Sequence, residues 1–141
     1  QACSNFLLDG SEDSGFLISA RTMDLGDGLS FGVSTVPRGS KIGSSQSADV
    51  GVSLFGFIGI VPVELGIALD HFVTAGMNSH GLSCDQQTLL GSVYPNKTGN
   101  ATTDVSIDHF CERVLARFND TVGLAEALLV YFNFILTFTF Y

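Results

Sequence analysis

Basic residues are scarce in this sequence, and tryptophan is absent. Lysine and arginine together number 6 against 14 aspartate and glutamate residues, which gives a formal net charge of −8 at pH 7. Such a chain has no basic patch to neutralise phosphates, so we expect no nucleic-acid partner and no anionic membrane surface. Charged residues make up only 14% of the chain and hydrophobic residues 45%. That composition predicts a folded globular domain and excludes a disordered segment.

A run long enough to span a bilayer is also lacking. The most apolar stretch is the C-terminal "VYFNFILTFTFY", which holds no charged side chain and shows no clear helical or strand period. Even counted from Ala127, it falls short of the roughly 20 residues that a membrane-spanning helix needs. We therefore expect no stable membrane span. Residues 130–141 are interpreted as a tail, either a buried strand without its partners or non-native sequence.

Histidines are few, and their spacing does not predict a metal site. His71, His80 and His109 fall on an expected strand, an expected turn and an expected helix, with no ligand spacing among them. The "GDG" at residues 26–28 is followed by neither a lysine nor a helix where a phosphate-binding loop requires them. The sequence therefore predicts no metal and no other cofactor.

Only three cysteines are present, so at most one intramolecular disulfide forms and one thiol remains. In an oxidising compartment Cys84 and Cys111 can form that bridge, although two core thiols also fit the pattern, and Cys3 is then left over. Three Asn-x-Ser/Thr sequons favour a glycosylated protein of the secretory pathway, either secreted or lysosomal. The sequons begin at Asn96, Asn100 and Asn119.

Apolar runs alternate with glycine, serine and aspartate turns up to about Leu90, with a period that suits strands. The stretch "DLGDG" predicts a hairpin between the second and third strands, and "SHG" predicts one between the last two. The polar stretches "RGSKIGSSQSAD" and "GSVYPNKTGNATT" are expected to be surface loops. The expected strands are Cys3–Leu8, Phe16–Met23, Leu29–Val36, Val50–Gly59, His71–Asn78 and Leu82–Leu89.

The hydrophobic period changes after this block. In "DVSIDHFCERVLARF" the apolar residues recur at helical spacing, which predicts an amphipathic helix with Asp104 at its start. Asp120 then starts a second expected helix over "TVGLAEALL". A strand-rich block followed by two helices predicts the α+β class with a mainly antiparallel sheet. We expect one domain over residues 3–129.

The thiol of Cys3 has three alternative roles: a buried core residue, half of a disulfide, or a nucleophile that becomes the N-terminal residue after processing. The small Ala2 before it matches the end of a signal peptide. As the first residue, Cys3 would have its own α-amino group as a base. Two antiparallel strands joined by "DGSEDSG" would bring Arg21, which favours a thiolate, and Asp24, which can hold the amine, beside the chain start. The alternative is a core Cys3 with a surface Arg21–Asp24 ion pair.

Five short motifs favour the nucleophile. In order and spacing, "ACSNFLL", "ISARTMDLG", "STVPRG", "TAGMNSHGLS" and "HFCERVLARFND" resemble the choloylglycine hydrolase family, which includes penicillin V acylases and bile salt hydrolases. The family's elements correspond here to Cys3, Ala20–Asp24, Val36–Gly39 and Met77–Leu82. The resemblance runs from Cys3 to about Leu129 and covers less than half of the family's domain.

The resemblance implies the αββα sandwich of N-terminal-nucleophile hydrolases, here incomplete, and a reaction without a cofactor. Cys3 would cleave a linear, non-peptide carbon–nitrogen amide bond, and Arg21 and Asp24 match the arginine and aspartate beside the family's thiol. The implied substrates have hydrophobic acyl groups: phenoxyacetyl-type penicillins, conjugated bile acids or N-acyl amides. Thr88 stands where the family places an asparagine or tyrosine of the oxyanion site, so only its backbone N–H would serve there.

Two alternatives stay open. An acid ceramidase-like lipid amidase also begins at cysteine, which it would release by self-cleavage. A catalytically inactive, truncated secreted glycoprotein module would keep the scaffold for binding alone. The short length and Thr88 favour that module, whereas Cys3, Arg21 and Asp24 together argue against it. The partner expected of an active enzyme is a small-molecule amide, and a homo-oligomer is left open.

Overall fold

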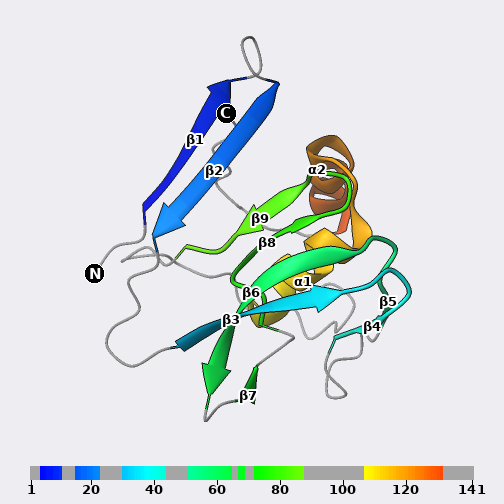
Figure 1. Ribbon diagram of the computed structural model, residues 1–141. Coiled ribbons are helices and arrows are strands. Elements are labelled where there is room, and N and C mark those ends of the chain that lie inside the picture. Colours follow the sequence, from blue (N-terminus) through cyan, green and yellow to red (C-terminus); the bar gives the residue numbers. More distant parts are fainter. Residues whose placement is uncertain are drawn as a thin grey trace. The chain divides into compact units, whose positions relative to one another are not determined.

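The computed structural model describes residues 4–10, 15–22, 30–43, 51–64, 67–68, 72–87 and 107–131. These residues belong to two compact units. The hairpin unit contains strands β1 and β2, and the sheet–helix unit contains strands β3 to β9 and helices α1 and α2 (Figure 1). A strand-rich block followed by two helices agrees with the predicted α+β class.

The hairpin unit is an antiparallel pair formed by β1 (Ser4–Gly10) and β2 (Phe16–Thr22). Every residue of β1 has a partner in β2. The Gly15 N–H donates to the Gly10 carbonyl over 3.2 Å, and Gly15 has a φ of 70°, a left-handed conformation that suits glycine. The predicted pairing of the first two strands is therefore confirmed.

The sheet–helix unit is built on an antiparallel sheet with the strand order β3, β6, β8, β9, and β7 pairs with the end of β6. A separate two-stranded ribbon pairs β4 with β5. The hairpin predicted at "SHG" is the β8–β9 pair, which confirms it. The strands are β3 (Ser30–Val36), β4 (Lys41–Ile42), β5 (Gly51–Val52), β6 (Phe57–Glu64), β7 (Ile67–Ala68), β8 (Ala75–Asn78) and β9 (Ser83–Asp85).

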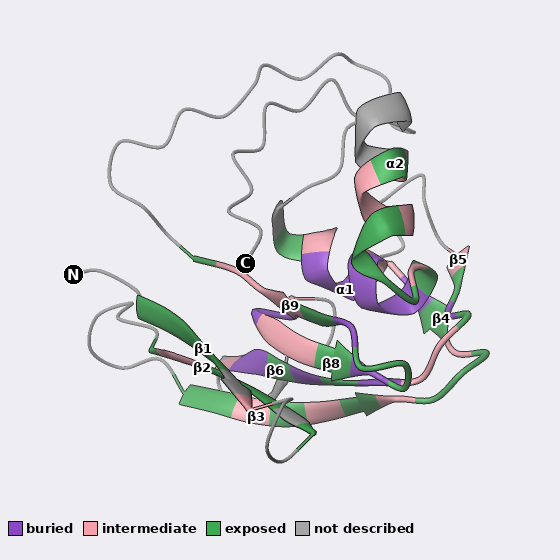
Figure 2. Cartoon of the chain, turned by 90° about the horizontal axis from the view of Figure 1, so that it is seen from above, coloured by how far each residue is buried: buried purple, intermediate pink, exposed green. Residues whose placement is uncertain are grey.

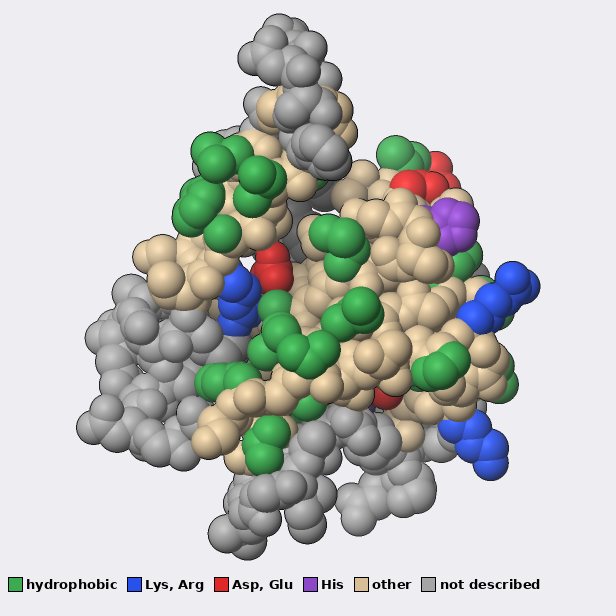
Figure 3. Space-filling view, in the orientation of Figure 1, with side chains coloured by type: hydrophobic (Ala, Val, Ile, Leu, Met, Phe, Trp, Pro, Cys, Tyr) green, Lys and Arg blue, Asp and Glu red, His purple; other side chains and the backbone are tan. Residues whose placement is uncertain are grey.

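The two faces of this sheet differ in burial. Along β6, Phe57 and Val61 are 3% and 0% exposed, whereas Ile58, which points to the opposite face, is 55% exposed. Helix α1 lies over the buried face, and the opposite face carries a group of exposed apolar side chains (Figures 2 and 3). This group is termed the open face and consists of Phe31, Val33, Ile58, Ile60 and Met77.

Helix α1 spans Ile107–Arg117, and its buried side chains follow the helical period that the sequence predicts: Cys111, Val114 and Leu115. Leu115 lies very close to Gly76 of β8. A Cβ atom at Gly76 would come within 2.6 Å of the Ile58 carbonyl oxygen and 2.7 Å of the Leu115 Cδ1, so a larger residue there would force the backbone of β6 or the Leu115 side chain to shift. Asp104, the expected start of this helix, lies outside the described residues.

Helix α2 spans Thr121–Tyr131 and begins where the sequence predicts. The Gly123 N–H donates to Oδ1 of Asp120 over 2.7 Å, the hydrogen bond of a helix N-cap. The helix includes the first two residues of the expected tail at 130–141, and residues 132–141 lie outside the described ones. In the part of the chain that the structure describes, neither helix combines the length and the apolarity that crossing a bilayer requires.

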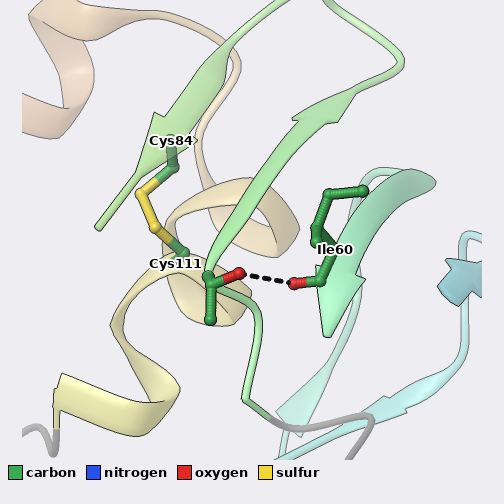
Figure 4. Close-up of a disulfide and its surroundings, with 4 residues drawn as sticks. Ile60, Cys84 and Cys111 are labelled. Atoms are coloured by element: carbon green, nitrogen blue, oxygen red, sulfur yellow. Dashed lines mark hydrogen bonds between the residues drawn. A yellow bond between two sulfur atoms is a disulfide. The ribbon is translucent and has the colours of Figure 1, made fainter. Parts of the chain in front are cut away.

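A disulfide joins Cys84 of β9 to Cys111 of α1, with a Cα–Cα distance of 5.5 Å that is usual for such a bond (Figure 4). The dashed line in Figure 4 marks a hydrogen bond of 3.1 Å that the Thr74 hydroxyl donates to the Ile60 carbonyl. Of the two arrangements considered from the sequence, the bridge is therefore the one present. The bridge fastens α1 directly to β9. It also holds α1 close to β8, because Cys84 of β9 pairs with Gly76 of β8.

The side chain of Asn78 uses all four of its hydrogen-bonding positions. Its Nδ2 donates to the carbonyls of Leu115 and Phe118 over 3.1 and 2.7 Å, at the C-terminal end of α1. Its Oδ1 accepts from the N–H groups of His80 and Leu82 over 3.0 and 3.1 Å, in the β8–β9 turn. Asn78 is only 5% exposed, so these bonds satisfy groups that water does not reach.

The "DLGDG" segment of one expected hairpin lies outside the described residues, and in those that are described β2 pairs with β1 and β3 pairs with β6, each over seven matched residues. One strand prediction is wrong. The expected strand Val50–Gly59 is interrupted between β5 and β6. There the Ser53 carbonyl accepts from the Gly39 N–H, and the Leu54 N–H donates to the Ala116 carbonyl, each over 2.8 Å, so these groups leave the strand ladder.

The expected loop "RGSKIGSSQSAD" also contains structure that the sequence analysis missed. Strand β4 lies within it, and Ile42 is 4% exposed, as part of the hydrophobic core. Glu112 of α1, itself buried, accepts from the Gly43 N–H with both carboxylate oxygens, over 3.3 and 3.2 Å. A contact 69 residues apart in sequence thus holds this segment, and local composition carries no sign of it.

Replacing Asn78 with alanine is expected to destabilise the protein by about 3 kcal/mol, because it leaves buried carbonyl and N–H groups without partners. Urea unfolding followed by circular dichroism measures the loss. Ser79→Ala, at the next and exposed position, is the matched control and should change stability by less than about 0.5 kcal/mol. Equal effects of the two variants would contradict the role given to the Asn78 side chain.

Removing the disulfide with the double variant Cys84→Ala/Cys111→Ala is expected to cost about 3.5 kcal/mol, because the bridge closes a loop with a sequence separation of 27. The measurement is the urea midpoint with and without a reductant. The reductant should lower the midpoint of the parent protein and leave that of the double variant unchanged. If the urea midpoint of the parent protein is the same with and without the reductant, the bridge does not form.

Candidate functional site

The structure describes one of the four residues predicted for the site. Arg21 lies in β2, whereas Cys3, Asp24 and Thr88 lie outside the described residues. Their roles therefore stay predictions. Cys3 and Thr88 each adjoin a described segment, and Asp24 lies two positions beyond Thr22, the end of another.

Ser4, which follows Cys3, lies beside Thr22, which stands two positions before Asp24. In the register of the hairpin, Ser4 is opposite Thr22 and Asn5 is opposite Arg21. The Ser4 N–H also donates to Oγ1 of Thr22 over 3.1 Å. The hairpin thus brings Ser4 and Thr22 together.

Strand parity places Arg21 on one face of the hairpin. Directly opposed residues of an antiparallel pair share a face, so Arg21 shares its face with Asn5, Ser19 and Leu7. The other face is apolar and exposed over its middle, where it carries Phe6, Leu8 and Ile18. Arg21 itself is half-buried. The face that carries Arg21 therefore holds polar residues, such as Asn5 and Ser19, together with the apolar Leu7 and Leu17, whereas Ser4 and Thr22 lie on the other face.

Thr88 follows directly on the end of a described segment. Strand β9 ends at Asp85, and the Gln86 N–H continues the pairing by donating to the Thr74 carbonyl over 2.8 Å. Described structure stops at Gln87. The proposed use of the Thr88 backbone N–H as an oxyanion donor is accordingly a prediction that the structure leaves untested.

The described histidines lie apart from one another. His80 is exposed in the β8–β9 turn, where its ring meets that of Phe55 edge to face at 4.7 Å. His109, on α1, lies 3.4 Å from a carboxylate oxygen of Glu112. Over the described ranges no group of three or more histidine, cysteine, aspartate or glutamate residues is arranged to hold a metal ion. His71 lies outside those ranges.

Comparison with known proteins identifies the fold. No family model and no curated protein matches the chain. A solved structure does match: a cysteine-to-alanine mutant of the conjugated bile acid hydrolase from Clostridium perfringens, with a TM-score of 0.63 and 20% sequence identity. The match covers 91% of this chain and 37% of that chain.

The likeness shows the fold and, at this identity, nothing finer. The neighbour is a choloylglycine hydrolase, which is the family that the sequence motifs resemble. The chain spans little more than a third of the length of that enzyme.

Proposed function

We propose that the chain carries the nucleophile-bearing part of a cysteine N-terminal-nucleophile amidohydrolase. The observation that carries the proposal is the register of the hairpin unit, which ties the residue after Cys3 to Thr22 and sets Arg21 one position further along. The fold shared with a hydrolase of conjugated bile acids supports it.

In the proposed reaction, Cys3 is the first residue of the mature protein. Its α-amino group accepts the thiol proton, and the thiolate attacks the carbonyl carbon of the amide. The carbon–nitrogen bond of the tetrahedral intermediate then breaks, and the nitrogen takes the proton and leaves as the amine. Water attacks the remaining thioester, which releases the carboxylic acid and restores the thiol of Cys3.

Three other residues have supporting roles in this scheme. The guanidinium of Arg21 stabilises the thiolate, because a nearby positive charge favours the ionised thiol. The carboxylate of Asp24 holds the α-amino group in place. The backbone N–H of Thr88 donates to the oxyanion of the tetrahedral intermediate.

The proposed substrates are linear amides with a hydrophobic acyl group. The bile acid hydrolase that shares the fold acts on conjugated bile acids, and the motif resemblance extends this class to phenoxyacetyl-type penicillins and N-acyl amides. A small molecule of this kind would be the only partner that the chemistry requires.

The proposed fold is a layered αββα sandwich of which this chain supplies one part. The open face supports this, since Val33 is 70% exposed and Met77 50% exposed, and a sheet with two apolar faces is stable when both are covered. The chain matches 37% of the neighbour, so the second sheet would come from sequence outside these 141 residues.

The proposed location is the secretory pathway, as a secreted or a lysosomal protein. Disulfides persist in oxidising compartments, and the Cys84–Cys111 bridge fits such a compartment. The three sequons are the independent support from the sequence.

A second candidate is an inactive binding module of the same fold, and the coverage of 37% is the observation that favours it. The N-terminus of the secreted, deglycosylated protein separates the two. Sequencing and intact mass that begin at Cys3, together with release of amine from penicillin V, a glycine-conjugated bile acid or an N-acyl amide, would support the hydrolase. A chain that still begins at Gln1, or a Cys3 terminus without turnover of any of the three, favours the module.

Cys3→Ser is expected to lower the rate of amide hydrolysis at least about 1,000-fold, because the oxygen nucleophile is far less ionised than the thiol. Steady-state kinetics measure the loss, and N-terminal sequencing of the variant checks that processing still exposes position 3. The urea midpoint should equal that of the parent. Retained turnover would rule out Cys3 as the nucleophile.

Arg21→Lys is expected to lower kcat/KM about 100-fold with little change in stability, because lysine keeps the charge but loses the planar guanidinium fork. The matched control is Arg38→Lys, which changes an exposed arginine in the turn after β3 and should leave the kinetics unaltered. If the two variants hydrolyse substrate equally fast, Arg21 has no part in the reaction.

A further inference from the structure

The sequon Asn119-Asp120-Thr121 spans the turn after α1 and the first residue of α2, and all three of its residues are exposed. It is the one sequon of the three whose residues all fall in the described part of the chain; Asn96 and Asn100 do not. Its geometry can therefore be compared with what an N-linked glycan requires, which is an accessible asparagine amide in a surface turn.

Both ends of this turn are anchored by hydrogen bonds. Before it, the Phe118 carbonyl accepts from Nδ2 of the buried Asn78 over 2.7 Å, and the Phe118 N–H donates to the Val114 carbonyl over 3.1 Å. After it, the Asp120 carboxylate is engaged by the Gly123 N–H as the cap of α2. Asn119 thus lies between two residues, Phe118 and Asp120, that hydrogen bonds hold in place.

The two residues of the sequon that glycosylation uses are available. Among the residues that the structure describes, no hydrogen bond engages the side chain of Asn119 or the hydroxyl of Thr121. The carboxylate of Asp120, which stands between them, is occupied by the helix cap and does not compete for the Asn119 amide. An exposed amide next to an exposed acceptor hydroxyl is the arrangement that the modification needs.

An independent observation concerns the compartment. The Cys84–Cys111 disulfide is part of the fold, and its Cys111 is fully buried. The bond therefore forms as the chain folds, which requires an oxidising compartment such as the endoplasmic reticulum lumen. N-linked oligosaccharide is added in that same compartment.

We propose that Asn119 is an N-glycosylation site, and that the glycan marks the helix side of the sheet–helix unit as its outer surface. In the modification, the Asn119 amide nitrogen bonds to the anomeric carbon of a lipid-pyrophosphate-linked oligosaccharide. The bond from that carbon to the phosphate oxygen breaks, the lipid pyrophosphate leaves, and the amide proton passes to the transferase.

The position of the glycan has a structural consequence. Helices α1 and α2 and the turn between them lie on one side of the sheet, and the open face lies on the other (Figure 2). A large hydrophilic glycan on the helix side is incompatible with a second protein layer at that turn. A layer that completes the fold would then lie on the open face, whose apolar residues are exposed. This step rests on the proposed secretory location and not on the proposed hydrolase activity.

The experiment is expression of the full chain behind a secretion signal in a eukaryotic host. Peptide N-glycosidase treatment in ¹⁸O-water then marks each glycosylated asparagine as heavy aspartate. Trypsin cleaves after Arg117, and no lysine or arginine follows, so the peptide that begins at Phe118 contains Asn119 and neither of the other two sequons. We expect the heavy label in this peptide. An unlabelled peptide would overturn the proposal.

The matched pair of variants is Thr121→Ser and Thr121→Ala. The serine variant keeps the hydroxyl of the sequon and should retain the label, whereas the alanine variant keeps Asn119 and should lose it. A label that survives in the alanine variant would refute sequon-dependent modification at this site. Amide hydrolysis is assayed on the same samples, so a labelled but inactive protein would count against the hydrolase proposal alone.

Discussion

The carboxamide of Asn78 is the interaction on which the sheet–helix unit depends. One buried side chain ends helix α1 through the Leu115 and Phe118 carbonyls and shapes the β8–β9 turn through two backbone N–H groups. The helix is thereby held at one position on the sheet, where Gly76 allows Leu115 to approach closely. The Cys84–Cys111 bond secures the same helix covalently. The exposed turn after α1 begins at Phe118, whose carbonyl the Asn78 side chain holds.

This anchoring leaves the unit with two unlike faces. Helix α1 covers one side of the sheet with a core that includes Val61, Cys111 and Leu115, while the other side exposes apolar residues such as Val33 and Ile58. Hydrophobic burial is the main favourable term in folding. An uncovered apolar sheet face therefore indicates a surface that binds another protein layer. It agrees with a chain that spans 37% of a larger enzyme with the same fold.

The hairpin unit contains Arg21, the one residue of the proposed site that the structure describes. Its register fixes which residues lie beside the chain start, and a shift of one residue would move Arg21 to the opposite face. The Ser4–Thr22 hydrogen bond holds that register at the end next to Cys3. Such a constraint matters next to a chain end, because strand ends otherwise fray.

The sequence by itself determined the features that depend on neighbouring residues. The helical period around Cys111, the cap at Asp120 and the pairing of β1 with β2 are local, and all three appear in the structure. The short motifs around Cys3 and Arg21 likewise named the family of the structural neighbour. They did not reveal the roles of Asn78 and Glu112, since a buried amide or carboxylate is defined by distant partners.

Only the tertiary structure decided which strands pair and where strands are interrupted. Strand β3 pairs with β6, and Leu54 bonds to Ala116, 62 positions away by their numbers. Backbone N–H and carbonyl groups are identical in every residue, so their choice of distant partner is not written in local composition. It is settled by which arrangement buries the most apolar surface while leaving the fewest of those groups unsatisfied.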